Sequence, residues 1–463
     1  MNYDLIVIGS GPGGYVAAIR ASQLGMKTAI VEREHLGGVC LNWGCIPTKS
    51  LLKSAQVYGY ASNAEKYGVK IDGAISVDYE AIVARSREIA ENMNKGVQYL
   101  LKKNKIDVIW GTGKIESEGN VSVTGSDSTM TLLTASYIIL ATGARPREIE
   151  NLPIDGKKII SYRQALSLPK LPKSMLVVGS GAIGSELAYF YQSIGTEVTL
   201  VECMPQIVPF EDEDISRQLE RSFKKIGMKV LTKSTVENVK TSGKDCKVTI
   251  KTPKGIETQD VSIVFSAVGI TPNIENIGLE KLKIKTEKGR LEVDERYQTN
   301  ISGIYAIGDI INTPALAHVA SAEGIACVEH IADKEPAPLN YSNIPGCIYT
   351  SPEVASVGLT EKAAKEAGYE IKTGKFPFTA SGKAAAIGEK DGFVKLIFDE
   401  QYGELLGAHL IGQNVTEMIS ELVLAKNMDV AAHEIIKTIH PHPTMAEAIM
   451  EAAAAAYGEV IHM

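Results

Sequence analysis

LIVIGSGPGG at residues 5–14 and MLVVGSGAIG at residues 175–184 are the two stretches that decide how this 463-residue chain folds. A second apolar run follows each stretch at the same interval: TAIVE at residues 28–32 and VTLVE at residues 198–202. The matching positions are offset by 170 residues (179 − 9 and 202 − 32). A duplicated pattern of this kind is much less probable by chance than a single motif, so it indicates an internal repeat.

Each copy predicts a buried strand, a tight glycine turn, a helix and a second strand that ends in an acid. In this dinucleotide-binding pattern the glycines permit the turn, the approach of a pyrophosphate and close packing of the helix. The helix N-terminus offers N–H groups to the diphosphate, and the acid can accept hydrogen bonds from a ribose. One glycine turn alone also occurs between ordinary strands and helices. Two copies predict two sites, formed by Gly9, Gly11, Gly14 and Glu32, and by Gly179, Gly181, Gly184 and Glu202.

A third strand extends the comparison between the two copies. YIILATG at residues 137–143 resembles IVFSAVG at residues 263–269, with an offset of only 126 (269 − 143). The first copy therefore contains 44 additional residues (170 − 126) between its second and third strands. This interval includes Cys40, Cys45 and a predicted helical stretch from about residue 48 to residue 104. The cysteines thus belong to the first dinucleotide domain.

Composition narrows the class of protein. With 44% hydrophobic and 22% charged residues, the chain is typical of a folded enzyme with roughly three domains. A formal charge of −7 offers no basic face for nucleic acid. No apolar run approaches the ~20 residues of a membrane helix, and the N-terminus does not resemble a signal peptide. We therefore expect a cytoplasmic enzyme without nucleic-acid or membrane partners.

The last third of the chain has a different pattern. Short alternating strands are predicted at residues 355–358, 392–398 and 405–411, together with two Ala-rich helices and no nucleotide turn. This arrangement indicates an α+β segment from about residue 340. We expect it to be a dimerisation domain.

The segment GGVCLNWGCIPTK at residues 37–49 carries the two neighbouring cysteines. In a regular helix five residues advance about 7.5 Å, whereas a disulfide needs Cα atoms about 4.4–6.8 Å apart. A distorted helix entry at Gly44 and Pro47 could bring the sulfurs together. Two cysteines that merely pack as small apolar residues are an alternative, and a zinc site lacks a second ligand pair nearby. The position after the first nucleotide pattern favours a redox disulfide facing a flavin, with no metal.

A candidate base lies near the other end, in HPHPTMAE at residues 440–447. If Glu447 accepts from one nitrogen of His442, the other nitrogen can take a proton from a substrate thiol. Alternatively, Glu447 caps a helix with Thr444, because Thr-x-x-Glu is a helix-start pattern. The two roles are compatible.

The chain resembles the pyridine nucleotide–disulfide oxidoreductases of class I over essentially its whole length, and most closely the lipoamide dehydrogenases among them. The resemblance rests on the first glycine turn, the redox segment at residues 38–49, ATG at residues 141–143, Gly308-Asp309 and HPT at residues 442–444. It implies an α/β fold with two Rossmann-like dinucleotide-binding domains, for FAD and NAD, plus a C-terminal α+β dimerisation domain. The implied segments are 1–145 (FAD and the redox disulfide), 146–272 (NAD), 273–341 (completing the FAD domain) and 342–463 (the dimer interface).

The resemblance also implies roles for individual residues. Cys45 would lie nearer the flavin and Cys40 would exchange with the substrate. Lys49 would lie beside the flavin N5 and pair with Glu186, and His442 with Glu447 would reach the site from the other subunit of a homodimer. The remaining implied FAD contacts are Gly9, Gly11, Gly14, Glu32, Lys49, Gly113, Thr142, Gly143, Asp309, Ala317 and His318. The implied NAD contacts are Gly179, Gly181, Gly184, Glu186, Glu202 and Gly269.

The implied reaction is the oxidation of protein-bound dihydrolipoamide by NAD⁺, within 2-oxo acid dehydrogenase or glycine cleavage complexes. The implied partners are their lipoyl and subunit-binding domains. Glu202 favours NAD, because its carboxylate would repel the 2′-phosphate of NADP. Ala182 stands where glutathione reductases carry a Tyr, while Pro441 and Met445 are minor departures from the lipoamide dehydrogenase pattern. A flavoprotein that serves mainly as a binding subunit is the alternative from another class.

Overall fold

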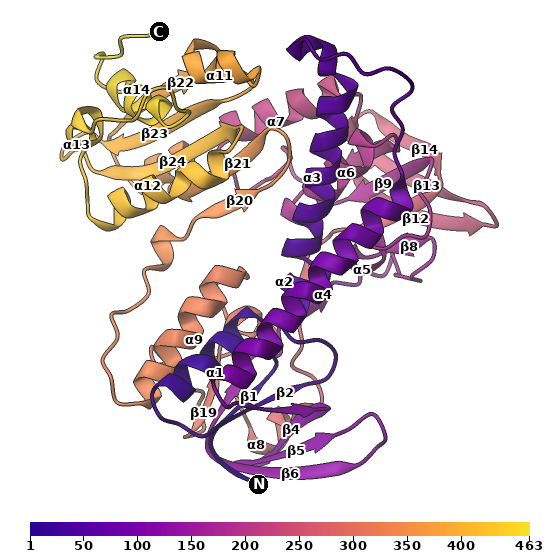
Figure 1. Cartoon of the computed structure of the whole chain (residues 1–463), viewed down its shortest axis with the longest axis vertical. Coiled ribbons are helices and arrows are strands. Elements are labelled where there is room, and N and C mark those ends of the chain that lie inside the picture. The colour runs from indigo at the N-terminus through magenta and orange to yellow at the C-terminus, as the bar shows by residue number, and fades with distance from the viewer. The chain divides into compact units, whose positions relative to one another are not determined.

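The computed structural model describes residues 1–463, which form two compact units of several segments each (Figure 1). Unit 1 consists of residues 1–51, 78–147 and 269–341, and unit 2 of residues 52–77, 148–268 and 342–463. The four-part domain division expected from the sequence stays a prediction. No helix combines the length and the apolar composition that a membrane crossing requires.

The sheet of unit 1 has the parallel core expected of a dinucleotide-binding domain. Its order is β3-β2-β1-β6-β5-β4, and β19 also pairs with β6. Strands β1, β2, β3, β6 and β19 run parallel, whereas β5 pairs antiparallel with both of its neighbours, β4 and β6. The bounds are β1 Asn2–Ile8, β2 Thr28–Glu32, β3 Asp107–Trp110, β4 Thr112–Ser117, β5 Asn120–Thr124, β6 Met130–Leu140 and β19 Ile304–Ala306.

Helices α1 and α9 of unit 1 lie side by side (Figure 1). They approach closely because both carry glycine at the contact: a Cβ on Gly324 would lie 2.7 Å from the carbonyl oxygen of Gly13. The other helices of this unit include the two that flank the cysteines. The bounds are α1 Pro12–Gln23, α2 Gly38–Trp43, α3 Cys45–Ser62, which continues into unit 2, α4 Tyr79–Lys103, α8 Leu279–Leu282 and α9 Ala317–Ile331.

The helical stretch predicted from about residue 48 to residue 104 is wrong in its middle. Helix α3 ends at Ser62, a 3₁₀ turn follows at Ala64–Tyr67, and α4 begins only at Tyr79. Gly68 (φ +74°) and Gly73 (φ +103°) adopt left-handed backbone conformations between the two helices. Gly68 ends the 3₁₀ turn, and left-handed conformations, which glycine adopts without steric cost, prevent the chain from resuming a right-handed helix before α4.

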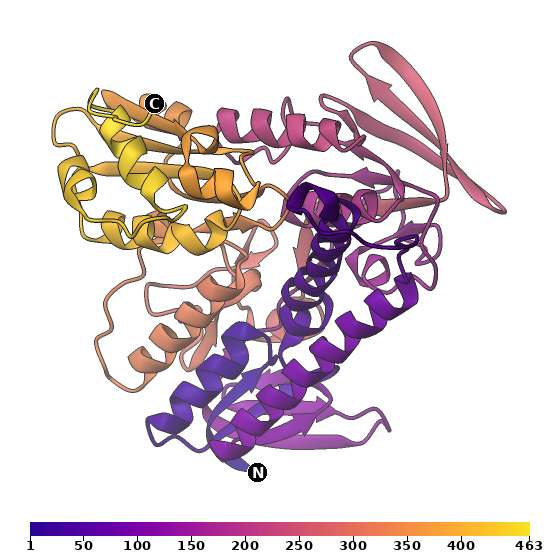
Figure 2. The same cartoon turned by 45° about the horizontal axis from the view of Figure 1, so that its top comes forward.

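Unit 2 repeats the parallel core with a second sheet of order β11-β10-β9-β15-β8. Its first four strands match β3-β2-β1-β6 of unit 1, as the duplicated sequence predicts. A separate antiparallel sheet, β12-β13-β14, extends away from this core (pink in Figure 2). The bounds are α5 Tyr162–Ala165, β8 Ile159–Ile160, β9 Ser174–Val178, α6 Ala182–Ser193, β10 Glu197–Val201, α7 Glu213–Lys225, β11 Lys229–Leu231, β12 Thr235–Ser242, β13 Asp245–Thr252, β14 Gly255–Val261 and β15 Ile263–Ser266.

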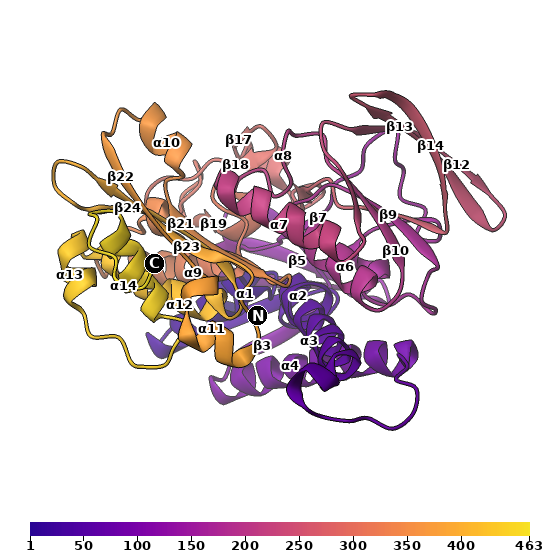
Figure 3. The same cartoon turned by 90° about the horizontal axis from the view of Figure 1, so that it is seen from above.

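The C-terminal part of unit 2 is a five-stranded antiparallel sheet of order β20-β21-β24-β23-β22. Helices α12, α13 and α14 lie on one face of it (Figure 3). The strands predicted at residues 355–358, 392–398 and 405–411 are present. The bounds are β20 Gly346–Ile348, β21 Glu353–Gly358, α10 Glu361–Glu366, β22 Ile371–Pro377, α11 Gly382–Ile387, β23 Phe393–Asp399, β24 Leu405–Gly412, α12 Val415–Asn427, α13 Ala432–Lys437 and α14 Glu447–Ala455.

A buried ion cluster fastens α7 to this sheet within unit 2. The Lys395 side chain is only 4% exposed and pairs with Asp212 at 2.9 Å, Glu361 at 2.8 Å and Asp214 at 3.2 Å. Burial raises the pKa of Asp212, but the hydrogen bond and charge of Lys395, the charge of His409 and the backbone N–H of Asp214 together outweigh burial, so the pKa is lowered overall. The cluster therefore buries the cation and Asp212, while Asp214 and Glu361 remain partly exposed at its edge.

Candidate redox and cofactor sites

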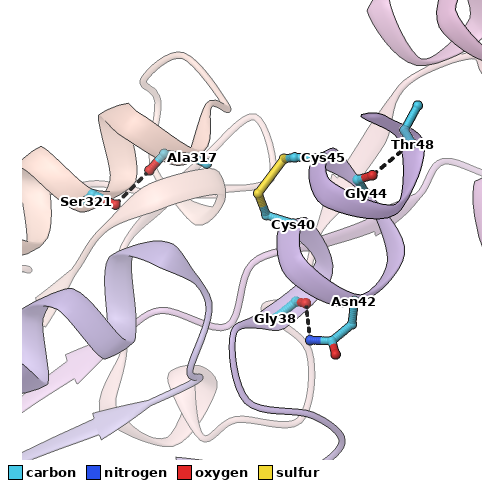
Figure 4. The surroundings of a disulfide bond; sticks show 8 residues. All are labelled: Gly38, Cys40, Asn42, Gly44, Cys45, Thr48, Ala317 and Ser321. Carbon is cyan, nitrogen blue, oxygen red and sulfur yellow. Dashed lines mark hydrogen bonds between the residues drawn. A yellow bond between two sulfur atoms is a disulfide. The ribbon is translucent and has the colours of Figure 1, made fainter. Parts of the chain in front are cut away.

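Cys40 and Cys45 form a disulfide at the junction of α2 and α3 (Figure 4). Their Cα atoms are 4.7 Å apart, within the range that a disulfide needs. Helix α2 ends at Trp43, Gly44 leaves the helical conformation with φ −145° and ψ −113°, and α3 begins at Cys45. This interruption is the distorted helix entry that the glycine at position 44 predicts.

Hydrogen bonds hold both sides of the interruption. The hydroxyl of Thr48 donates to the carbonyl oxygen of Gly44 at 2.7 Å, and its backbone N–H donates to the same oxygen at 3.1 Å. On the other side, the buried Asn42 amide donates to the carbonyl oxygens of Leu36 at 2.8 Å and Gly38 at 2.9 Å. The position of the cysteines is thus set by the backbone around them as well as by the bond between them.

The first glycine turn has the open geometry that a dinucleotide requires. A Cβ on Gly9 (φ +102°) would lie 2.2 Å from the carbonyl oxygen of Ala141, and a Cβ on Gly14 would lie 1.9 Å from that of Gly9. Nothing lies within 4 Å of a Cβ built on Gly11, the residue that precedes α1. No side chain caps this helix start, so its N–H groups are available to a diphosphate.

The second turn repeats these contacts in unit 2. A Cβ on Gly179 (φ +97°) would lie 2.5 Å from the carbonyl oxygen of Ala267, and a Cβ on Gly184 would lie 1.9 Å from that of Gly179. Gly181 is again open, and no side chain caps α6. The residues of both turns therefore fit a dinucleotide diphosphate.

The acid of each copy is fixed by a serine that our sequence reasoning missed. Ser10 donates from its backbone N–H and its hydroxyl to Glu32 at 3.1 and 2.5 Å, and Ser180 donates likewise to Glu202 at 2.8 and 2.6 Å. Burial raises the pKa of Glu202, but the hydrogen bonds from Ser180 and Met204 outweigh burial and lower it. A carboxylate oxygen has more than one lone pair, so each acid can still accept from a ribose. The identical serine in both copies was the available signal.

Asp309 lies in the turn after β19, at residues 308–310. Burial raises the pKa of its carboxyl, and the charge of Arg290 opposes this only in part. Hydroxyl donors of a ribityl chain would stabilise such a carboxylate. The turn is held by the fully buried Glu323, which accepts from the backbone N–H of Gly308 at 2.7 Å and from the hydroxyl of Tyr341 at 2.9 Å. Our sequence reasoning missed Glu323, although a single acid on the apolar face of a helix was visible.

Thr142 and Gly143, predicted to contact FAD, follow β6 after Ala141. The Thr142 hydroxyl donates to the carbonyl oxygen of Asn273 at 2.6 Å, and the Asn273 amide donates back to the carbonyl oxygen of Thr142 at 3.0 Å. Gly143 has φ +66° and open space beside it, as does Gly269 (φ +112°) of the second copy. Asn273, another residue missed from the sequence, therefore fixes the end of β6.

The other predicted FAD residues of unit 1 lie on separate elements. Ala317 and His318 begin α9, and the disulfide lies on the side of α2 and α3 that faces Ala317 (Figure 4). Gly113 lies in β4, where an added Cβ would be 3.0 Å from Cγ2 of Ile8. The structure thus brings Ala317 toward the disulfide and places Gly113 against β1.

Lys49 and Glu186, expected to pair, belong to different compact units. Lys49 lies four residues after Cys45 in α3 and hence on the same side of that helix. Glu186 lies in α6, where it is buried and accepts from the backbone N–H of Tyr349 at 3.0 Å. Their pairing stays a prediction.

His442 and Glu447 form the predicted pair in unit 2. His442 Nδ1 lies 2.8 Å from Glu447 Oε1, and the other carboxylate oxygen accepts from the backbone N–H of Thr444, also at 2.8 Å. Glu447 therefore orients the imidazole and caps the chain before α14. The His442 side chain is 79% exposed, so Nε2 can reach an external thiol. Burial raises the pKa of Glu447, but the bonds from Thr444 and His442 outweigh burial and lower it.

Comparison with known families covers nearly the whole chain. Residues 3–324 match the family described as pyridine nucleotide-disulphide oxidoreductase. Residues 344–453 match the dimerisation domain of the same family, which supports a homodimer. The two matches divide the chain near the start of the C-terminal α+β segment.

Individual relatives agree with this match. The chain is 48% identical to a dihydrolipoyl dehydrogenase of Rhizobium etli, over 100% of this chain and 99% of the relative, and 49% identical to one of Zymomonas mobilis, with the same coverage. The crystal structure of LpdA from Mycobacterium tuberculosis superposes with a TM-score of 0.89 at 28% identity, covering 97% of this chain and 98% of that one. These findings confirm the predicted fold class. The chain belongs to the pyridine nucleotide-disulphide oxidoreductase family.

Proposed function

We propose that this chain oxidises dihydrolipoyl groups with NAD⁺, through the Cys40–Cys45 disulfide and FAD. The observation that carries the proposal is the disulfide at the break between α2 and α3, in the same unit as the first nucleotide turn. Relatives that are 48–49% identical over their full length are named dihydrolipoyl dehydrogenases. Family and relatives confirm the predicted enzyme class and the two cofactors.

The disulfide exchanges with the substrate in two steps. His442 takes a proton from one dihydrolipoyl thiol, and the resulting thiolate attacks the sulfur of Cys40, so that Cys45 leaves as a thiolate. The second substrate thiol then attacks the substrate sulfur of the mixed disulfide, which closes the lipoyl disulfide, and its proton passes to Cys40, which leaves as a thiol. Two electrons and two protons have then left the substrate.

The chain's own groups would hold FAD at the first turn. N–H groups at the start of α1 bind the diphosphate, Glu32 accepts from the ribose, and Asp309 accepts from the ribityl chain. Lys49 contributes a positive charge on the side of α3 that carries Cys45. When bound, FAD supplies the two-electron chemistry that connects the reduced cysteines with NAD⁺.

Glu202 explains the choice of NAD in this proposal. Its pKa is lowered, so the carboxylate is charged at neutral pH and would repel a 2′-phosphate. No Arg or Lys lies between residues 198 and 206 to compensate for that charge. NADP would therefore bind poorly at the second turn.

The homodimer completes the site in this proposal, with His442 and Glu447 of one subunit acting on the disulfide of the other. The exposure of His442 in the single chain is consistent with that arrangement. We further propose lipoyl and subunit-binding domains of 2-oxo acid dehydrogenase or glycine cleavage complexes as partners, and a cytoplasmic location.

The decisive assay uses the purified FAD-loaded protein with NADH or NADPH and three disulfides: lipoamide, oxidised glutathione and cystine. We expect rapid turnover only with NADH and lipoamide. Cys45→Ser should abolish it, with Cys246→Ser, a free cysteine of β13 outside the disulfide and both nucleotide turns, as the control. A preference for NADPH and glutathione, or full activity of Cys45→Ser, would contradict the proposal.

A further inference from the structure

Helix α4 contacts the redox helices on both sides of the break at Gly44, through three consecutive residues at positions 85–87. Two of the three reach α3. Arg85 Nη1 donates to the carbonyl oxygen and the hydroxyl of Ser50 at 3.2 and 2.8 Å, and the Ser86 hydroxyl donates to the carbonyl oxygen of Pro47 at 3.3 Å. Helix α4 therefore acts as a support along the start of α3.

The third residue, Arg87, reaches α2 on the other side of the break. Its guanidinium carbon lies 4.6 Å from the ring centroid of Trp43, which stands between the two cysteines in the sequence. Cation–π contact of this kind holds a guanidinium over an indole face. The side chains at positions 85–87 thus contact residues before and after Gly44.

Arg87 is unusual because its charge lacks an acidic partner. Its Nε and Nη2 atoms are buried and make no hydrogen bond. Burial lowers the pKa of the guanidinium, and no carboxylate offsets this effect. Leaving a half-buried cation without a counter-charge is unfavourable, so a negative charge that appears nearby during the reaction would be stabilised.

We infer that Arg87 is a positioning residue of the redox centre, whose charge favours the reduced, thiolate form of the Cys40–Cys45 pair. The inference rests on the redox role proposed above for this disulfide. Oxidised, the pair is neutral. Once reduced and deprotonated, one sulfur carries a negative charge within the segment that Arg87 contacts.

This inference can be tested by the equilibrium between the enzyme disulfide and dithiothreitol, which requires neither NAD⁺ nor a lipoyl substrate. The Cys40–Cys45 disulfide and one dithiothreitol yield two cysteine thiols and one cyclic dithiothreitol disulfide, with two electrons and two protons transferred. One thiol then releases its proton to solvent. The position of this equilibrium in anaerobic dithiothreitol mixtures can be read by alkylation and mass spectrometry of the peptide that contains both cysteines.

The experiment compares Arg87→Met and Arg87→Lys in the FAD-loaded enzyme. Lys95→Gln is the matched control, because it also removes a cation from α4, at an exposed position paired with Glu91. At pH 8 we expect Arg87→Met to shift the equilibrium about tenfold toward the disulfide, or about 30 mV. Arg87→Lys should stay within about threefold of the unchanged enzyme, and Lys95→Gln should have no effect.

The pH dependence separates charge from mere support of the helices. The shift caused by Arg87→Met should shrink as pH falls, because a protonated thiol has no charge to stabilise. An unchanged equilibrium at pH 8, or a shift of the same size at every pH, would overturn the inference. Either result leaves the proposed function intact, since that depends on the NADH and lipoamide assay. If Arg87→Met loses FAD, Arg87→Gln removes the same charge with a polar side chain and is compared in its place.

Discussion

Glu447 shows how one carboxylate can serve two partners: one oxygen orients His442 and the other accepts from the N–H of Thr444. Glu447→Gln keeps an oxygen for Thr444 but removes the charge that stabilises a protonated imidazole. We expect kcat/KM with lipoamide to fall about 10- to 100-fold, within the range for general acid–base groups. Steady-state kinetics measures this, and circular dichroism should be unchanged.

The control for this change is Glu434→Gln, which neutralises an exposed acid of α13 in the same part of unit 2. It should leave kcat/KM within twofold. Equal losses in both variants would mean that general surface charge, and not the pair, supports the reaction.

Glu202→Gln tests the choice of nicotinamide cofactor. The amide can still accept from Ser180, so the turn should persist, while repulsion of a 2′-phosphate disappears. We expect the ratio of kcat/KM for NADH to that for NADPH to fall about tenfold, since a single charge contact is commonly worth about 1–2 kcal/mol. The duplicated chain offers its own control in Glu32→Gln, which should change FAD content but not this ratio.

At the residue level, the sequence predicted contacts between residues that lie close together along the chain. The pairing of His442 with Glu447 needed only five residues of separation, and the structure confirms this geometry. Asn273 escaped prediction because its partner Thr142 lies 131 residues away. The fold brings Thr142 and Asn273 together, and no single sequence motif contains both residues.

At the element level, α1 and α9 depend on two glycines where they meet. We expect Gly324→Ala to lower the free energy of unfolding by about 1–3 kcal/mol, because the new methyl group would lie 2.7 Å from the carbonyl oxygen of Gly13. FAD content should fall as well, since α1 starts at the first nucleotide turn. Urea denaturation and flavin absorbance measure the two effects.

Gly96→Ala is the matched control in the same unit. Gly96 lies inside α4, with nothing within 4 Å of an added Cβ. Alanine there should stabilise the protein by about 0.5–1 kcal/mol. If both variants lost stability equally, close packing of α1 on α9 would not be the cause.

Helices and strands were predictable where the spacing of apolar residues and the length of the apolar run were clear, as in both parallel sheets. The break between α3 and α4 was not, because the apolar pattern continues on either side of it. Only the backbone at Gly68 and Gly73 shows that the chain leaves the helix. The interruption at Gly44 was predictable, since a disulfide five residues apart requires it.

For the molecule as a whole, Glu211 makes stability depend on pH. Burial, and secondly the charge of Asp212, raise its pKa to about 7, and its Oε2 is buried without a partner. Below about pH 4 the carboxyl is protonated in both folded and unfolded chains. As pH rises to about 7 only the unfolded chain ionises freely, so this group lowers the free energy of unfolding by up to about 3 kcal/mol.

Glu211→Gln should remove that dependence. We expect the variant to gain about 1–3 kcal/mol over the unchanged protein at pH 8, and much less at pH 5. Urea denaturation at the two pH values measures the difference. Glu213→Gln, at an exposed neighbour paired with Arg217, should show no such pH dependence, and a gain independent of pH would contradict the assignment.

At the same scale, the duplication was the most informative sequence feature, because it predicted two nucleotide sites and the interval that contains the disulfide. It could not predict the Lys395 cluster. That cluster joins residues 212–214 to residues 361 and 395, which lie in segments of unrelated pattern.

The break at Gly44 has a consequence for the enzyme between turnovers. Because hydrogen bonds from Thr48 and Asn42 hold the backbone on each side, Cys40 and Cys45 should remain neighbours when no bond joins them. Closing the ring is then an intramolecular event with a very high effective concentration, which small thiols in solution do not match. If one cysteine is held in a mixed disulfide with a foreign thiol, the thiolate of the other should therefore attack that bond, restore the Cys40–Cys45 disulfide and release the foreign thiol before a second one can react.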